Sequence, residues 1–71
     1  MWHCITDKIG QNIKEYREKN QLTQEQLASI VHINRTTLSR YESGNRVPCL
    51  EVLWLMADCF EISIDELVGR V

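Results

Sequence analysis

The feature that most constrains the fold of this chain is the stretch LTQEQLASIVHINRTTLSRYESG at positions 22–44. It contains two helix starts and one helix stop. Thr23 and Gln26 fit a capping box, in which each side chain accepts a hydrogen bond from the other residue's backbone N–H. Asn34 is a good N-cap for a second helix, and Gly44 supplies the left-handed conformation that commonly follows a helix. The stretch therefore predicts two short helices joined by a tight turn.

Apolar side chains in this stretch recur at the spacing of buried helix faces. They are Leu27, Ala28, Val31, Leu38 and Tyr41. Ala28 is small where another helix would have to approach closely. His32 and Ile33 form the predicted turn, with Ile33 directed inward.

Helical spacing also predicts one helix before this stretch and two after it. The first is capped by Thr6 or Asp7, ends near Asn20 and has an inner stripe of Ile9, Ile13 and Tyr16. The fourth follows a short connector at residues 46–48, and its broad apolar face contains Leu50, Leu53, Trp54, Ala57 and Phe60. A second capping box, Ser63 with Glu66, opens a short fifth helix that contains Ile64, Leu67 and Val68.

No strand-like alternation runs long enough to predict a sheet. The chain is therefore expected to form one all-α domain of five helices over residues 1–71. Its core is expected at about residues 7–69, and residues 1–5 are expected to form a flexible N-terminal extension.

The size and composition of the chain limit its function. With 71 residues, of which 44% are hydrophobic, it is expected to form a small globular domain. A helical domain of this size seldom encloses a catalytic pocket of roughly 300 Å³ or more. No nucleophile–base pair is present, so neither an enzyme nor a cofactor is predicted. The three cysteines have no repeating spacing, and no signal peptide or membrane span is visible, which predicts a cytoplasmic protein with reduced thiols.

The distribution of charge is more informative than the net charge of −2. Residues 1–50 carry seven Lys/Arg and five Asp/Glu, whereas residues 51–71 carry one Arg and five Asp/Glu. Three arginines and a single glutamate lie between Asn34 and Arg46. A nucleic-acid partner is therefore compatible with the acidic total, because local clustering of basic charge decides such binding.

The outer face of the helix at about residues 34–43 carries this positive charge. Arg35, Thr36, Ser39 and Arg40 fall at offsets i, i+1, i+4 and i+5, which share one side of a helix. Arg can donate two hydrogen bonds to guanine O6 and N7, and Thr can contact a thymine methyl group. This face is therefore a candidate for insertion into the major groove of double-stranded DNA.

The sequence resembles the helix-turn-helix proteins of the lambda repressor and Cro type, also called the xenobiotic-response-element family. The resemblance covers about residues 7–69 and is carried by Leu22-Thr23-Gln24, Leu27-Ala28, Ser39-Arg40-Tyr41-Glu42-Ser43-Gly44 and Ile62-Ser63-Ile64-Asp65-Glu66-Leu67. It implies a lambda-repressor-like fold and a DNA-binding transcriptional regulator, with repression as the expected activity. The docking geometry implied by the resemblance is that of the phage repressors, which are themselves the standard example of the motif.

The resemblance also implies roles for individual residues. Gln24 is expected to hold a backbone phosphate, and Asn34 to cap the third helix near the DNA backbone. The base-contacting set is expected to be Arg35, Thr36, Ser39 and Arg40, with Thr37 at its margin. Ser43, Asn45 and Arg46 are expected to contact phosphate after the third helix.

Four further positions are interpreted from the resemblance. Arg17 and Glu42 are expected to form a buried ion pair that orients the third helix. His32 stands where the family usually has Gly, and Cys49 stands where Ser or Thr usually caps the fourth helix. The turn is therefore expected to be slightly strained, and that cap to be weak.

Alternative interpretations remain for several residues. His3, Cys4, His32, Cys49 and Cys59 lack the paired spacing of a zinc site, so no metal is predicted and the thiols are expected at the core or its boundary. Trp54 fills the core, or it joins a C-terminal apolar surface that covers a partner. A homodimer on an inverted repeat is the favoured partner arrangement. An antitoxin with a toxin or effector partner, or an interaction module without DNA binding, are the alternatives.

Overall fold

Five helices make up the described part of the chain in the computed structural model, which describes residues 5–69 and the side chains of residues 8–69. They are α1 (Ile5–Lys19), α2 (Gln24–Ile30), α3 (Arg35–Ser43), α4 (Leu50–Phe60) and α5 (Ile64–Val68). No strand occurs among these residues, which confirms the all-α prediction. None of the helices is long and apolar enough to cross a membrane.

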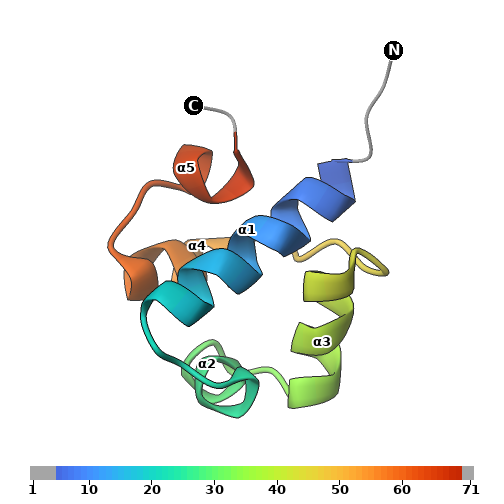
Figure 1. Ribbon diagram of the computed structural model, residues 1–71, viewed down its shortest axis with the longest axis vertical. Helices are drawn as coiled ribbons and strands as arrows, with labels where there is room; N and C mark the ends of the chain where they lie inside the picture. Colours follow the sequence, from blue (N-terminus) through green and yellow to red (C-terminus); the bar gives the residue numbers. More distant parts are fainter. Residues whose placement is uncertain (1–4, 70–71) are drawn as a thin grey trace.

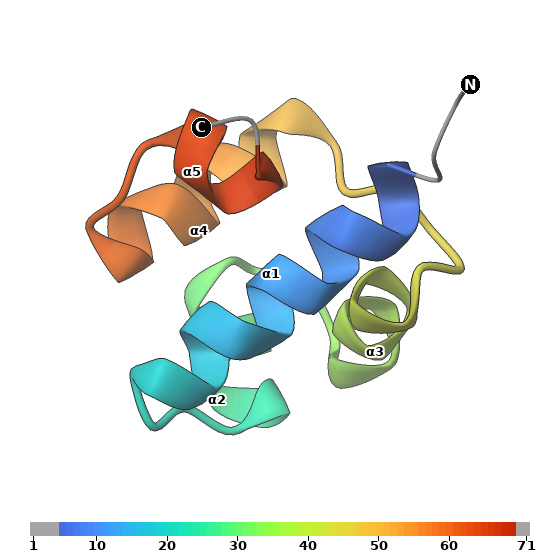
Figure 2. The same cartoon turned by 45° about the horizontal axis from the view of Figure 1, so that its top comes forward.

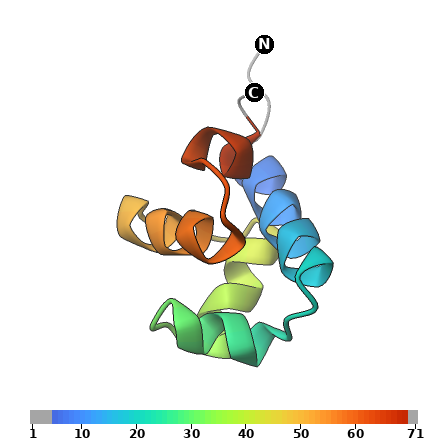
Figure 3. The ribbon, with the colours of Figure 1, turned by 90° about the vertical axis from the view of Figure 1, so that its left-hand side faces the viewer.

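Helix α1 crosses the middle of the molecule (Figure 1). It packs against α3 on one side and against α5 on the other, and α4 lies beside α5 (Figure 2). Helices α2 and α5 lie at opposite ends of the molecule, with α4 between them (Figure 3). The α2–α3 pair is therefore held by α1 and α4 from within, and its outer side faces solvent.

The core contains side chains from all five helices. They are Ile9, Ile13, Leu27, Ala28, Val31, Leu38, Tyr41, Val52, Leu53, Met56, Ala57, Phe60 and Leu67. The stripe predicted for α1 is present, since Tyr16 packs at the edge of this core. Burial of these apolar groups is the main source of stability in a domain this small.

Side-chain caps fix the helix starts as the sequence predicts. Thr23 and Ser63 each form a complete capping box, with Gln26 and Glu66 respectively. Cys49 makes no capping hydrogen bond at the start of α4, which confirms the expected weak cap. The local sequence therefore determines where α2 and α5 begin.

The ends of α1 differ from the prediction. The helix begins at Ile5, so Thr6 and Asp7 lie inside its first turn and neither is the cap. The expected N-terminal extension falls on residues 1–4, which lie outside the described residues, and on Ile5, which is helical. At its other end the helix stops at Lys19, close to the predicted Asn20, whose side chain donates to the Tyr16 carbonyl oxygen at 2.8 Å; the left-handed residue that follows is Gln21 (φ 59°).

The buried face of α4 also differs from the prediction. Leu53, Ala57 and Phe60 are buried, but Leu50 and Trp54 are 65% and 58% exposed. Val52 and Met56 are buried in their place. Because apolar residues occur all around this helix, their spacing alone did not identify which stripe faces the core. The interpretation of Trp54 as a core residue is therefore wrong.

Candidate nucleic-acid interface

The exposed face of α3 presents the charged and polar side chains that the sequence predicted. Leu38 and Tyr41 anchor the opposite face in the core. This burial turns four side chains to solvent, namely Arg35, Thr36, Ser39 and Arg40. Thr37 is half-buried at the edge of this surface. Since α3 spans nine residues, its exposed face has the length of a short recognition helix.

The two ends of α3 are fixed by local hydrogen bonds. Asn34 Oδ1 accepts a hydrogen bond from the Thr37 backbone N–H at 2.7 Å, so Asn34 is the N-cap and its side-chain oxygen is already used. At the other end Gly44 is left-handed (φ 86°), and the Asn45 backbone N–H donates to the Arg40 carbonyl oxygen at 3.0 Å. This stop leaves Asn45 and Arg46 exposed directly beyond the helix.

Ser43 is placed differently from the neighbouring polar residues. It is exposed, but its hydroxyl donates to the Arg40 carbonyl oxygen at 3.0 Å. Its hydroxyl oxygen remains available as an acceptor. Ser43 therefore contributes to the end of α3 as well as to the exposed surface.

Arg17 on α1 and Glu42 on α3 form a bidentate ion pair inside the molecule. Arg17 Nε lies 2.7 Å from Glu42 Oε2, and Arg17 Nη2 lies 3.3 Å from Glu42 Oε1. The side chains are only 11% and 5% exposed. Arg17 Nη1 also donates to the Leu22 carbonyl oxygen at 2.8 Å, so one guanidinium connects α1, α3 and the segment before α2.

This ion pair leaves the exposed face of α3 positively charged. Glu42 is the only acidic residue between Asn34 and Arg46, and Arg17 balances its charge. Arg35, Arg40 and Arg46 therefore give the surface a net positive field. A surface of this kind favours an anionic partner.

Gln24 contacts the ion pair, which the sequence did not predict. Its Nε2 donates to Glu42 Oε1 at 3.0 Å, and its Oε1 lies 3.5 Å from Arg35 Nη1. Gln24 and Arg35 border an open cleft of about 420 Å³, whose other lining residues are Arg17, Leu22, Thr23 and Glu25. The cleft lies between the end of α1 and the starts of α2 and α3, beside the exposed face of α3.

Gly10 is a second residue that positions the interface and that sequence analysis missed. A Cβ atom at Gly10 would lie 2.7 Å from the Glu42 carbonyl oxygen and closer still to that of Tyr41. Only glycine therefore allows the end of α3 to pack this closely on α1. The sequence signal was a glycine inside a helical pattern, where glycine costs about 1 kcal/mol relative to alanine and therefore calls for a packing reason.

The turn between α2 and α3 has the predicted strain. His32 is left-handed (φ 62°) and exposed. The Ile33 backbone N–H donates to the Ala28 carbonyl oxygen at 2.9 Å, and Ile33 packs against the core. The turn therefore keeps its backbone hydrogen bond to α2 and its contact with the core, although its left-handed residue is not glycine.

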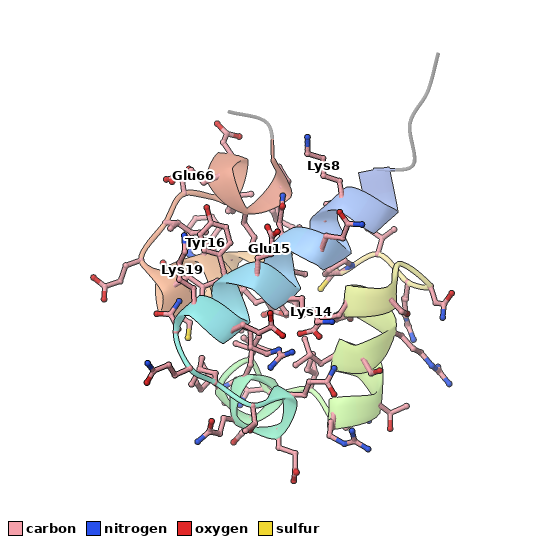
Figure 4. The ribbon with its side chains drawn as sticks, viewed as in Figure 1. Lys8, Lys14, Glu15, Tyr16, Lys19 and Glu66 are labelled. Carbon is pink, nitrogen blue, oxygen red and sulfur yellow. The ribbon has the colours of Figure 1, made fainter. Side chains whose placement is uncertain are left out.

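A second cleft, of about 300 Å³, lies between α1 and α5 and has a different character. Lys8, Glu15, Tyr16 and Lys19 of α1 and Glu66 of α5 are among the side chains that line it (Figure 4). Two positive and two negative groups therefore line this cleft, and its charge is balanced. Unlike the exposed face of α3, it does not select for an anion.

No group of three or more His, Cys, Asp or Glu among the described side chains is arranged to hold a metal ion. Burial raises the pKa of the Cys59 thiol, which lowers its thiolate population, while Cys49 is exposed. His3 and Cys4 lie outside the described residues.

The helix pair, its capped ends and the basic outer face define the class as a lambda-repressor-like helix-turn-helix domain. The helix-turn-helix family model HTH_3 matches residues 13–67, so the chain belongs to that family. The family is one of DNA-binding regulator domains rather than of enzymes.

Curated relatives are transcriptional regulators and related proteins. The chain is 43% identical over 63 residues to the cryptic phage CTXphi transcriptional repressor RstR of Vibrio cholerae, covering 89% of this chain and 56% of that protein. It is 41% identical over 62 residues to antitoxin PezA of Streptococcus pneumoniae, covering 87% of this chain and 39% of that protein. The chain thus spans about half the length of RstR and a smaller share of the length of PezA.

Two crystal structures share the fold over most of this chain. The restriction-modification controller protein C.AhdI of Aeromonas hydrophila is 29% identical with a TM-score of 0.84, covering 92% of this chain and 98% of that one. The P22 c2 repressor, crystallised with a synthetic operator, is 25% identical with a TM-score of 0.78, covering 83% and 89%. These similarities confirm the predicted lambda-repressor-like fold.

Proposed function

We propose that this chain represses transcription by binding DNA sequence-specifically, with α3 inserted in the major groove. The observation that carries this proposal is the exposed basic face of α3, held on a buried ion pair. Arg35 and Arg40 are the main base-contacting residues, because each can donate two hydrogen bonds to guanine. Thr36 and Ser39 lie between them, and Thr37 lies at the margin.

The residues around α3 are proposed to hold the DNA backbone. Asn45 and Arg46 follow the helix, and Gln24 lies beside its first residue, so all three can contact phosphate. Asn34 and Ser43 have side chains engaged in local hydrogen bonds and retain groups for further contacts. Phosphate contacts fix the position of a protein on DNA and give no base preference by themselves.

A homodimer on an inverted repeat is the proposed assembly. The exposed Trp54 and Leu50, with the half-buried Ile62 and Ile64, leave apolar surface on the C-terminal helices. A two-fold dimer through this surface would place two copies of α3 about 34 Å apart on one face of the DNA. Dimerisation would also compensate for the net negative charge of the chain, which weakens non-specific attraction to DNA.

Selection of bound sites from random DNA tests the proposal directly. We expect an enriched inverted repeat whose binding weakens as salt concentration rises, because bound phosphates release counterions. The absence of enrichment, together with no salt-dependent binding to any DNA, would contradict it. That result would favour an interaction module that retains the fold without binding DNA.

Substitution of Arg35 tests the base contact. Arg35→Ala should cost about 1–3 kcal/mol on the selected site and relax the preference at one base pair. Binding measured on the selected site and on random DNA separates this from a phosphate contact, which would weaken both equally. Lys8→Ala, a loss of one positive charge in the α1–α5 cleft, is the matched control and should preserve the base preference.

An antitoxin is the second candidate function. It is supported by the similarity to PezA and by the exposed apolar surface around Trp54. In that case the surface would bind a toxin protein, and the DNA contacts would be unchanged. Co-expression with the products of adjacent genes separates the candidates, because only an antitoxin would relieve a growth arrest caused by its neighbour.

A further inference from the structure

The side-chain amide of Gln24 lies between a buried carboxylate and a proposed base-contacting residue. On one side its Nε2 donates to Glu42 Oε1 at 3.0 Å. On the other side its Oε1 lies 3.5 Å from Arg35 Nη1, which is long for a hydrogen bond. Gln24 at the start of α2 thus connects Glu42 at the end of α3 with Arg35 at the start of α3.

Glu42 allows only one orientation of this amide. An ionised carboxylate only accepts hydrogen bonds, and both oxygens of Glu42 also accept from Arg17. If the amide were rotated by half a turn, its oxygen would face Glu42 Oε1 and two acceptors would lie in contact. The Nε2 group must therefore face Glu42, which turns the Gln24 oxygen toward Arg35.

Glu42 is itself held in place. Its side chain is 5% exposed, and the bidentate contact with Arg17 fixes the position of both oxygens. Gln24 is only half-buried and Arg35 is exposed, so neither would otherwise have one preferred arrangement. Order is thus transmitted outward from the buried ion pair to the surface of α3.

We infer that Glu42 is a positioning residue for base recognition, because it orients the Gln24 amide, which in turn directs the Arg35 guanidinium. This inference rests on the proposed function, in which Arg35 contacts a base. An arginine that is directed before binding loses less side-chain entropy when it forms its two hydrogen bonds to guanine. Gln24 then contributes to the base preference as well as to any phosphate contact.

Two substitutions of Gln24 test its contacts with Glu42 and with Arg35. Gln24→Met keeps the length of the side chain and removes both contacts. Gln24→Glu keeps an acceptor for Arg35 but places a carboxylate against Glu42. Neither change removes the Arg17–Glu42 ion pair, so both variants should fold. Gln11→Met, on the exposed surface of α1, is the matched control.

The informative quantity is the ratio of affinities for the selected site and for the same site changed at the base pair that Arg35 contacts. In both Gln24 variants we expect this ratio to fall about fivefold or more, the lower end of what one Arg–guanine contact contributes. Gln11→Met should leave the ratio unchanged. In an Arg35→Ala background, Gln24→Met should lower it no further.

Unchanged ratios in both Gln24 variants would overturn the inference, because a residue that only contacts phosphate weakens binding to all sequences alike. A normal ratio in Gln24→Glu alone would overturn the role of Glu42. Absence of DNA binding by the unsubstituted protein would instead mean that the proposed function fails, and the inference with it.

A measurement without DNA tests the structural basis separately. In the NMR spectrum of the free protein, the Gln24 side-chain amide should show slower solvent exchange than that of Gln11 and contacts to Glu42. Equal exchange of the two amides would show that Glu42 does not hold Gln24, whatever the outcome of the DNA experiments.

Discussion

Arg17 and Glu42 show how one buried pair of charges can serve both the fold and the surface. Each ion would be costly to bury alone, since removing a charge from water costs several kcal/mol. Here Arg17 uses three of its nitrogen atoms, toward Glu42 and the Leu22 carbonyl oxygen. No buried side-chain polar atom among the described residues lacks a hydrogen-bond partner. The pair therefore fixes α3 on α1, and the charged residues that remain exposed on α3 are both basic.

Removal of one partner should be far more costly than removal of both. We expect Arg17→Met to lower the free energy of unfolding by about 3–5 kcal/mol, because Glu42 would remain buried without its counter-ion. Thermal and urea unfolding measure this change. Lys14→Met, on the exposed surface of α1, should have little effect.

The double variant Arg17→Met/Glu42→Leu completes this comparison. Since it leaves no buried charge, much of the lost stability should return. Unchanged melting and DNA affinity in Arg17→Met would show that the pair has no structural role.

The backbone of His32 is left-handed, which is unfavourable for a residue with a Cβ atom. We expect His32→Gly to raise the free energy of unfolding by about 0.5–1 kcal/mol, because relief of strain exceeds the greater entropy of glycine in the unfolded chain. Thermal unfolding would measure the change. Ser29→Gly inside α2 is the control and should destabilise instead. A less stable His32→Gly variant would mean that the turn is not strained.

At the level of helices, the distance between α1 and α3 depends on Gly10. Alanine is ordinarily better than glycine inside a helix by about 1 kcal/mol. At this position, however, a Cβ atom would overlap the carbonyl oxygens of Tyr41 and Glu42 at the end of α3. The close packing of the two helices therefore outweighs helix propensity at Gly10.

We expect Gly10→Ala to destabilise the domain by about 1–3 kcal/mol, the usual cost of overpacking. Chemical unfolding measures it, and Gln11→Ala, at the next and exposed position, should be neutral or slightly stabilising. DNA affinity should also fall, since α3 would have to move away from α1. A Gly10→Ala variant more stable than the parent would refute the proposed close packing.

The helices differ in how far the sequence determined them. The starts of α2, α3 and α5 were predicted because each depends on hydrogen bonds within three residues, as for Asn34 with Thr37. The buried face of α4 was not predicted correctly, because α4 has apolar residues on all its sides. Whether Trp54 or Met56 is buried depends on the neighbouring helices. The position of Gln24 was missed for the same reason, since its partner Glu42 is 18 residues away.

For the whole molecule, charge is divided between the two ends. The exposed arginines Arg35, Arg40 and Arg46 lie on or directly after α3, whereas the C-terminal part of the described chain carries exposed acidic residues. These are Glu51, Asp58, Glu61, Asp65 and Glu66. A dimer through the C-terminal apolar surface would bring the acidic groups of two copies together, and salt would screen their repulsion. Salt should therefore strengthen dimerisation while it weakens DNA binding.

Trp54 is the residue with which to test this assembly. It is 58% exposed and lies beside a cleft of about 200 Å³ that Ala57, Asp58, Ile62 and Ile64 help to line. We expect Trp54→Gln to weaken the dimer by about 2 kcal/mol or more, roughly 30-fold, as for aromatic residues central to an interface. Sedimentation equilibrium measures this, and Ile30→Gln, at a 45% exposed site on α2, should leave the dimer intact.

Because the core does not contain Trp54, thermal stability at low concentration should be retained in Trp54→Gln, and its affinity for the inverted repeat should fall toward that for a half-site. A Trp54→Gln variant that remains as dimeric as the parent would place the interface elsewhere.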